Sequence, residues 1–217
     1  EKNEADFISM GRQTIADPDY PNKIKAGRAD TIRRCLRCNE CLGEVMRNCG
    51  ISCAVNPEAG KEYEGFTKVE LAETPKKVAV IGAGPAGMEA AQIAVKRGHN
   101  VTLFEKNSEL GGALYYVSLP DFKLDYKDYT EYMIRETKAV VKDIRTDTEV
   151  TADLINGEAF DIAIVATGAE TFIPGIPRAE KGGILDPLKV LDGREKTGNR
   201  VIVCGAGLVG WEVGMVL

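Results

Sequence analysis

The sequence predicts an α/β chain in which a three-layer βαβ domain with a parallel sheet follows a cysteine-rich loop. Residues 76–106 read as an apolar strand, a glycine turn, an alanine-rich helix and a second apolar strand, which together make a βαβ unit. Residues 199–217 repeat the order of strand, glycine turn and helix. Strands that alternate with helices in this way are typical of a parallel sheet covered by helices.

The composition is that of an ordinary globular protein. Of the 217 residues, 44% are hydrophobic and 28% are charged, and the net charge is −5, so nothing favours a nucleic acid or an anionic membrane as a partner. No apolar run approaches the roughly 20 residues that span a bilayer. The first residues, EKNEADF, show no signal peptide. We expect a cytoplasmic location.

The remaining elements follow in chain order. Residues 6–10 read as a short strand, and DPDYPNKIKAG reads as a turn and a short helix that stops at Gly27. Residues 35–57 lack periodicity, which predicts a loop folded around a bound group, and residues 58–75 are a polar linker. We expect a helix over about 126–140 and a buried strand over 160–168.

The first glycine turn has the pattern that binds dinucleotides. Gly82, Gly84 and Gly87 stand between a strand and a helix, where they allow the tight turn, the approach of pyrophosphate and close packing of helix on strand. Glu105 ends the second strand, where an acid accepts hydrogen bonds from ribose hydroxyls. A Rossmann-like fold with a bound nucleotide is therefore expected. The spacing from Glu105 to Gly112 resembles FAD domains more than plain NAD domains.

A second glycine fingerprint lies at Gly205, Gly207 and Gly210. Two fingerprints separated by IAIVATG resemble the two-dinucleotide flavoprotein reductases, in which an NAD(P)H domain interrupts an FAD domain. In that resemblance Thr167 and Gly168 form the turn beneath the flavin. The choice between NADH and NADPH is open, because the residue that would read the ribose lies beyond Leu217.

Five of the six cysteines fall between Cys35 and Cys53. Disulfides are disfavoured, because disulfide frameworks spread their cysteines through small secreted domains. Zinc ribbons pair two distant C-x2-C knuckles, whereas the compact triple Cys35, Cys38 and Cys41 resembles ferredoxin-type binding of an iron–sulfur cluster. The spacing leaves Cys49 and Cys53 open as the fourth ligand, and zinc remains the alternative metal.

The order of GRQTIADPDYPNK, the cysteine triple, ISCAVNP and KKVAVIGAGPAG resembles the multidomain branch of the old yellow enzymes. This branch includes 2,4-dienoyl-CoA reductase, 2-enoate reductase and trimethylamine dehydrogenase. The resemblance selects Cys53 as the fourth ligand of a [4Fe–4S] cluster and leaves Cys49 spare. It makes residues 6–10 the last strand of an FMN-binding (β/α)8 barrel, with Gly11 and Arg12 at the FMN phosphate.

The resemblance also divides the chain. It implies the end of the FMN barrel over 1–34, the cluster segment over 35–57 and a linker over 58–75. An incomplete FAD- or ADP-binding domain over 76–177 and the start of an NAD(P)H domain over 178–217 then follow. The chain is expected to be a C-terminal fragment, inactive alone, and its half-domains are compatible with self-association into a homo-oligomer.

The function implied is a flavin oxidoreductase that passes electrons from NAD(P)H through FAD and the cluster to FMN, reducing an activated C=C bond of a small-molecule substrate. The alternatives are an amine dehydrogenase of the trimethylamine type and a zinc-bearing nucleotide module. No catalytic residue can be assigned. We expect His99 to have a structural role in a turn. We expect Cys204 to lie in a strand and to pack in the hydrophobic core. The cofactor-binding candidates are Gly11, Arg12, Gly82, Gly84, Pro85, Ala86, Gly87, Glu105, Lys106, Gly112, Thr167, Gly168, Gly205, Gly207 and Gly210.

Overall fold

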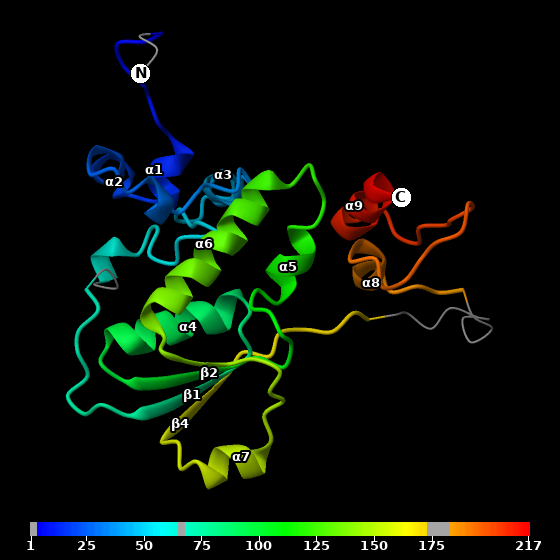
Figure 1. Cartoon of the computed structure of the whole chain (residues 1–217). Helices are drawn as coiled ribbons and strands as arrows, with labels where there is room; N and C mark the ends of the chain where they lie inside the picture. The colour runs from blue at the N-terminus through cyan, green and yellow to red at the C-terminus, as the bar shows by residue number, and fades with distance from the viewer. Residues whose placement is uncertain (1–3, 65–67, 173–182) are drawn as a thin grey trace.

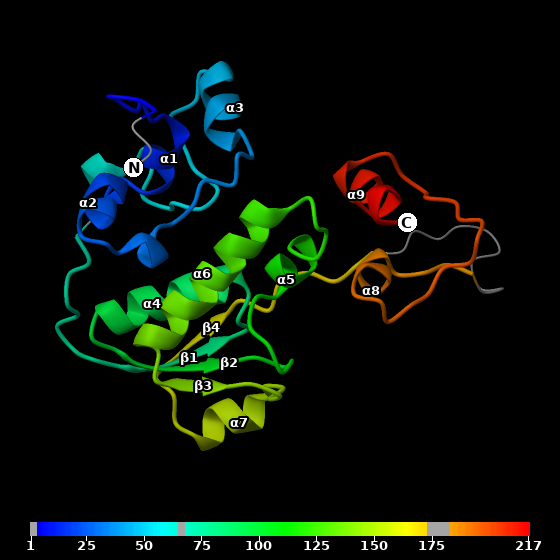
Figure 2. The same ribbon diagram turned by 45° about the horizontal axis from the view of Figure 1, so that its top comes forward.

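The computed structural model describes residues 4–64, 68–172 and 183–217 and is built on a four-stranded sheet. The strands lie in the order β3 (Asp143–Arg145), β2 (Asn100–Phe104), β1 (Lys77–Ile81), β4 (Ile162–Val165), and every pairing is parallel (Figures 1 and 2). The predicted α/β class and the βαβ unit are therefore confirmed. The strand predicted over 160–168 forms at β4, but it is mostly exposed rather than buried.

Strand β1 is the apolar centre of the sheet, with β2 on one side and β4 on the other. Val78 pairs with Val101 of β2 and with Ile162 of β4. The side chains of Val78 and Val80 are almost fully buried. Continuous apolar runs of this kind are expected for parallel strands covered on both faces.

Two long helices cover one face of the sheet. Helix α4 (Pro85–Lys96) follows β1, and α6 (Leu124–Val140) packs against α4, with a buried hydrogen bond of 2.9 Å from Gln92 to Thr137. The short helix α7 (Ala152–Gly157) lies on the opposite side of the sheet (Figures 1 and 2). The helix expected over about 126–140 is confirmed, and it begins two residues earlier.

Residues 12–64 contain more helix than the sequence predicted. It holds the short elements α1 (Arg12–Ala16), α2 (Tyr20–Lys25), η1 (Ala29–Thr31), α3 (Glu40–Met46) and η2 (Glu62–Glu64). Helix α2 and its stop near Gly27 were expected, but α3 was not. Asn39, which precedes the first turn of α3, has a left-handed conformation with φ 61°.

The strand predicted over residues 6–10 is wrong for this structure. These residues form no strand, and the side chains of Phe7 and Ile8 are 93% and 83% exposed. A strand needs a neighbour for its amide and carbonyl groups, and the described residues place none beside this segment. Figure 1 shows it extending away from the other elements.

The C-terminal segment differs from the prediction in the same way. Helices α8 (Pro187–Leu191) and α9 (Leu208–Val216) form there, but residues 200–204 pair with no strand that the structure describes. Helix α5 (Ala113–Val117) lies earlier in the chain, before α6. Cys204 is exposed, which corrects the expectation that it is packed in the core. An ion pair from Lys123 to Glu212 joins α9 to the start of α6.

Two further points complete the fold. The boundary predicted between residues 177 and 178 lies outside the described residues. Among the helices that the structure describes, none has both the length and the apolar character that crossing a bilayer demands.

Candidate functional site

The first glycine turn connects β1 to α4 and is closed by the end of β4. Gly82 has φ +100°, and a Cβ atom there would lie 2.4 Å from the carbonyl oxygen of Ala166. Only glycine fits this position. The same contact brings the predicted flavin-side residues Thr167 and Gly168, both exposed, beside the turn.

Gly84 and Gly112 touch each other across this turn. Gly112 has φ +53°, and a Cβ atom on it would lie 2.8 Å from the Cα of Gly84. Gly84, in contrast, is in ordinary extended conformation, and a Cβ atom on it would meet only Gly112, at 3.9 Å. The fold therefore requires glycine at 112 but leaves space beside Gly84, where a pyrophosphate must approach the backbone if a dinucleotide binds.

Glu105 lies inside the protein at the end of β2. Its side chain is 5% exposed and accepts a hydrogen bond of 2.8 Å from the amide of Ala83. It also accepts bonds from the backbone and side-chain nitrogens of Asn107, at 3.0 and 2.9 Å. A carboxylate has about four lone-pair sites, so room for one further donor remains. The adjacent Lys106 is exposed.

The second glycine turn has the backbone shape of the first. Gly84 and Gly207 both cap the following helix, with φ −71° and −78° and ψ −179° in each case. A Cβ atom on Gly87 or on Gly210 would lie 1.8 or 2.0 Å from the carbonyl oxygen of the first glycine of its turn. The helix of this second unit is formed, although the strand before it is not.

Four of the cysteines line one small cavity, and Cys49 is not among them. The lining residues are Arg12, Ile15, Cys35, Leu36, Cys38, Asn39, Cys41, Cys53, Ala54 and Val55. The exposed thiol of Cys49 instead donates to the carbonyl of Arg47. Among the described residues, no three side chains of histidine, cysteine, aspartate or glutamate lie close enough to hold a single metal ion. What the four thiols share is therefore this cavity.

The cavity is fixed to the core of the sheet domain. Cys35, Leu36 and Cys53 pack against the hydrophobic cluster that contains Val78 of β1 and Met88 of α4. Ala16 of α1 and Val55 belong to the same cluster. The cysteine segment and the βαβ unit therefore share one core.

Side chains that the sequence analysis did not identify hold the cysteine segments in place. Gln13 of α1 donates to the carbonyl of Arg33 at 2.9 Å and accepts from the amide of Cys35 at 3.0 Å. Asn56, which is 2% exposed, donates to the carbonyl of Ile15 at 2.8 Å and accepts from the Arg33 guanidinium at 3.0 Å. The only sequence signal was that both residues lie within the motifs that carry the resemblance.

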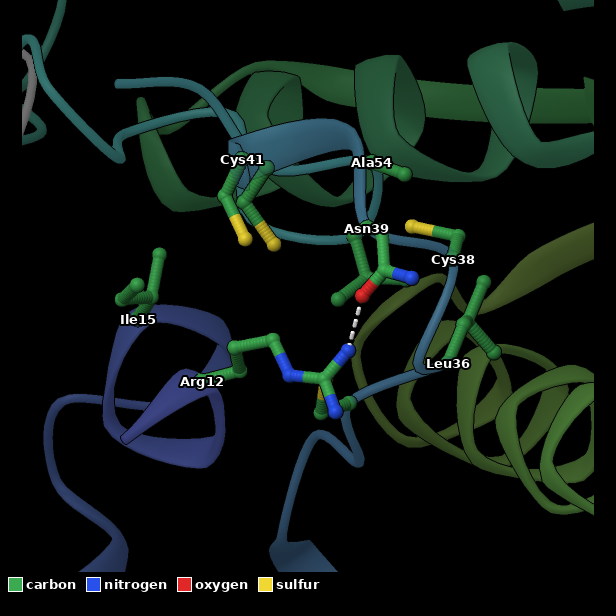
Figure 3. A pocket seen from close by; sticks show the side chains of 10 residues that line it. Arg12, Ile15, Leu36, Cys38, Asn39, Cys41 and Ala54 are labelled. Carbon is green, nitrogen blue, oxygen red and sulfur yellow. Dashed lines mark hydrogen bonds between the residues drawn. The ribbon is translucent and has the colours of Figure 1, made fainter. Parts of the chain in front are cut away.

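Arg12, predicted at the FMN phosphate, lies at the cysteine cavity. Its guanidinium donates to the side-chain oxygen of Asn39, and Figure 3 shows it reaching from α1 towards the segment that carries Cys38 and Cys41. Gly11 is exposed, and a Cβ atom there would meet no other atom within 4 Å. Arg12 therefore contacts the cysteine segment, whereas Gly11 faces open space. The role of both residues towards FMN stays a prediction.

Two tyrosines near the cavity have raised pKa values. Burial, followed by the negative charge of Cys38, raises the pKa of Tyr126. Burial is also the largest influence on Tyr129, whose pKa is raised to about 12. His99 serves a turn, as expected, because its Nδ1 accepts from the amide of Lys76 at 3.1 Å.

The sequence matches the family model described as pyridine nucleotide-disulphide oxidoreductase over residues 43–117 and 76–217. The chain belongs to this family. Its relatives include the bilirubin reductase of Mediterraneibacter gnavus, 39% identical over all of this chain and 34% of the relative. The chain spans about a third of the length of the curated relatives that it matches.

Two solved structures show the same architecture within larger proteins. The 2-naphthoyl-CoA reductase complex superposes with a TM-score of 0.89 at 33% identity, over 94% of this chain and 31% of that chain. The histamine dehydrogenase of Rhizobium sp. 4-9 superposes with a TM-score of 0.81 at 28% identity, over 89% and 30%. Reductases and an amine dehydrogenase therefore both occur among the neighbours, which agrees with the resemblance to the multidomain old yellow enzymes.

Proposed function

We propose that this chain is the electron-carrying part of an iron–sulfur flavoenzyme that reduces an activated C=C bond with NAD(P)H. In this proposal the first glycine turn holds FAD, the second holds NAD(P)H, and a [4Fe–4S] cluster bound by Cys35, Cys38, Cys41 and Cys53 passes electrons on to FMN. The bound groups would supply the redox chemistry, with two-electron transfer at the flavin and one-electron transfer at the cluster.

One observation carries the proposal: the four thiols line a single cavity that shares its core with the βαβ unit. Four thiolates around one zinc ion would each lie about 2.3 Å from it. In a cluster each thiolate binds a different iron atom, so the sulfurs stand around a larger group. The compact spacing of Cys35, Cys38 and Cys41, with Cys53 on the same cavity, favours the second case.

The residues of the nucleotide turn fit a dinucleotide. The space beside Gly84 leaves its backbone open to a pyrophosphate, and the start of α4 offers free amides to the phosphates. Glu105 has one acceptor position left for a ribose hydroxyl. The role of the protein here is to bind and orient the nucleotide.

The direction of electron flow is inferred from the second turn. Its backbone matches the first, with Gly207 as open as Gly84 to an approaching phosphate, which favours a second dinucleotide and hence a reductase. The likeness to histamine dehydrogenase favours the alternative, in which an amine is oxidised and electrons leave the protein. Anaerobic mixing of the full-length protein separates the two: reduction of its bound flavin by NADH or NADPH supports the reductase, and reduction only by amines supports the dehydrogenase.

The cluster is tested by metal analysis of protein that was purified without oxygen. We expect about four iron atoms and four sulfides per chain, and their loss in Cys35→Ser, Cys38→Ser, Cys41→Ser and Cys53→Ser. The variant Cys49→Ser is the matched control and keeps the full content, because its thiol lies outside the cavity. Stoichiometric zinc without sulfide would refute the proposal.

A further inference from the structure

The amide of Arg37 points at the sulfur of a proposed cluster ligand. Its nitrogen lies 3.4 Å from the Sγ atom of Cys35, within the range of a hydrogen bond to sulfur. Arg37 has φ +56°, a conformation that is uncommon and strained for a residue other than glycine. Such a conformation persists only where the surrounding structure holds it, so the contacts of Arg37 decide whether this hydrogen bond exists.

Arg37 is held from both sides. Its guanidinium Nε donates to the Oδ2 atom of Asp125 at 2.6 Å, and a second nitrogen of the same group pairs with that oxygen. Asp125 lies in the first turn of α6, where the positive end of the helix dipole stabilises a carboxylate, and its side chain is 24% exposed. On the other side, the preceding Leu36 packs against the hydrophobic core.

Hydrogen bonds to ligand sulfurs set the reduction potential of an iron–sulfur cluster. An amide donor withdraws electron density from the thiolate and stabilises the cluster after it has accepted one electron, which makes the potential less negative. We propose that Asp125 is a positioning residue for the cluster: through Arg37 it maintains the amide hydrogen bond to Cys35 and raises the reduction potential. This inference rests on the proposed function, because it requires the cluster.

The sign of the shift separates this mechanism from a simple charge effect. Replacing Asp125 by asparagine removes a negative charge and leaves Arg37 unpaired, so a through-space effect alone would make the potential less negative. Loss of the amide hydrogen bond makes it more negative. One turn further along α6, Asp128 forms an equivalent ion pair with Arg34, at 2.8 Å. Arg34 lies outside the stretch between Cys35 and Cys38, so Asp128→Asn is a matched control for charge.

The experiment is a redox titration of the anaerobically purified protein, followed by electron paramagnetic resonance. We expect Asp125→Asn to have a more negative midpoint potential than the wild type, Asp125→Glu to recover the wild-type value, and Asp128→Asn not to become more negative. A potential in Asp125→Asn that is unchanged or less negative, at full iron content, would overturn this inference alone. Zinc in place of iron in the wild type would overturn the proposed function and this inference with it.

A second measurement does not depend on the variant being well folded. Resonance Raman spectra of the wild type in H2O and D2O report whether an exchangeable proton is bonded to a ligand sulfur. We expect the iron–thiolate stretching bands to shift on exchange into D2O. Bands at the same frequencies in both solvents would show that no amide hydrogen bond reaches the ligand sulfurs, and the proposed role of Asp125 would be excluded.

Discussion

The buried carboxylate of Glu105 accepts a hydrogen bond of 2.8 Å from the backbone amide of Ala83, the residue between the first two glycines of the nucleotide turn. The acid expected to bind ribose is thus also part of the framework that shapes the turn. The same side chain binds Asn107 through its other oxygen. Nucleotide binding and the local fold are therefore coupled at this position.

Replacing Glu105 by alanine is expected to weaken both properties. The amide of Ala83 would be left buried without a partner, which costs about 1–3 kcal/mol of folding free energy. Loss of the ribose contact would reduce affinity for FAD or ADP by roughly tenfold to a hundredfold. Urea unfolding and nucleotide titration measure the two effects. An Ala variant with unchanged stability would show that the bond to Ala83 is unimportant.

Alanine substitutions at Gly82 and Gly84 are expected to have different effects: the first on stability and the second on nucleotide affinity. Alanine at Gly82 forces a strained backbone and a contact of 2.4 Å with the Ala166 carbonyl, so its melting temperature falls. Alanine at Gly84 meets only Gly112, at 3.9 Å, so its melting temperature stays near that of the wild type. Its affinity for FAD or ADP nevertheless falls, because the methyl group occupies the space of the pyrophosphate. A Gly84→Ala variant that binds nucleotide normally would contradict the proposed position of the phosphates.

Gln13 is expected to affect how much of the proposed cluster the cysteine site holds. In Gln13→Leu the amide of Cys35 loses its acceptor, and we expect iron content and the free energy of unfolding to fall, the latter by about 1 kcal/mol. Gln13→Glu is the control, because its carboxylate still accepts from Cys35 although it cannot donate to Arg33. Iron analysis and urea unfolding provide the readouts. Equal losses in both variants would argue against the bond to Cys35 as the cause.

The ion pair of Asp143 and Arg145 predicts a pH dependence of stability. Hydrogen bonding from Arg145 lowers the pKa of Asp143 below its usual 3.8. A carboxylate with a lowered pKa stabilises the fold above its unfolded pKa, and this contribution disappears as the pH falls through the folded value. Because Asp143 is 43% exposed, Asp143→Asn should cost only about 0.5 kcal/mol at pH 7. The difference from the wild type should shrink as the pH falls below 3.8, as urea unfolding over this range can verify.

The sequence predicted the βαβ unit well because its signals are local. An apolar run, a glycine turn and an alanine-rich helix each favour the observed conformation before any long-range contact forms. The cysteine cavity was predicted in part for the same reason, since Cys35, Cys38 and Cys41 are close in the chain. Residues 200–204 show the limit of such signals. An apolar run becomes a strand only beside a partner, and the described residues give it none.

The polar contacts around the cysteines could not be read from the sequence. Gln13 and Cys35 are 22 residues apart, and Arg37 and Asp125 are 88 apart. No periodicity or motif spacing reports such a pair, because the fold alone brings its members together. Helix α3 was missed since its entry depends on the left-handed conformation of Asn39, which a sequence pattern does not indicate.

Arg37 and Asp125 are far apart in the sequence, and this separation has a consequence for the order in which the protein folds and binds the proposed cluster. In small zinc-binding domains the metal organises an otherwise unfolded chain. Here α6 must already be in place before the loop between Cys35 and Cys38 gains its anchor. We therefore expect the order of events to be reversed: the polypeptide folds first, and the proposed cluster is inserted afterwards into the folded protein. Cells short of iron would then accumulate a folded, protease-resistant precursor rather than an unfolded chain.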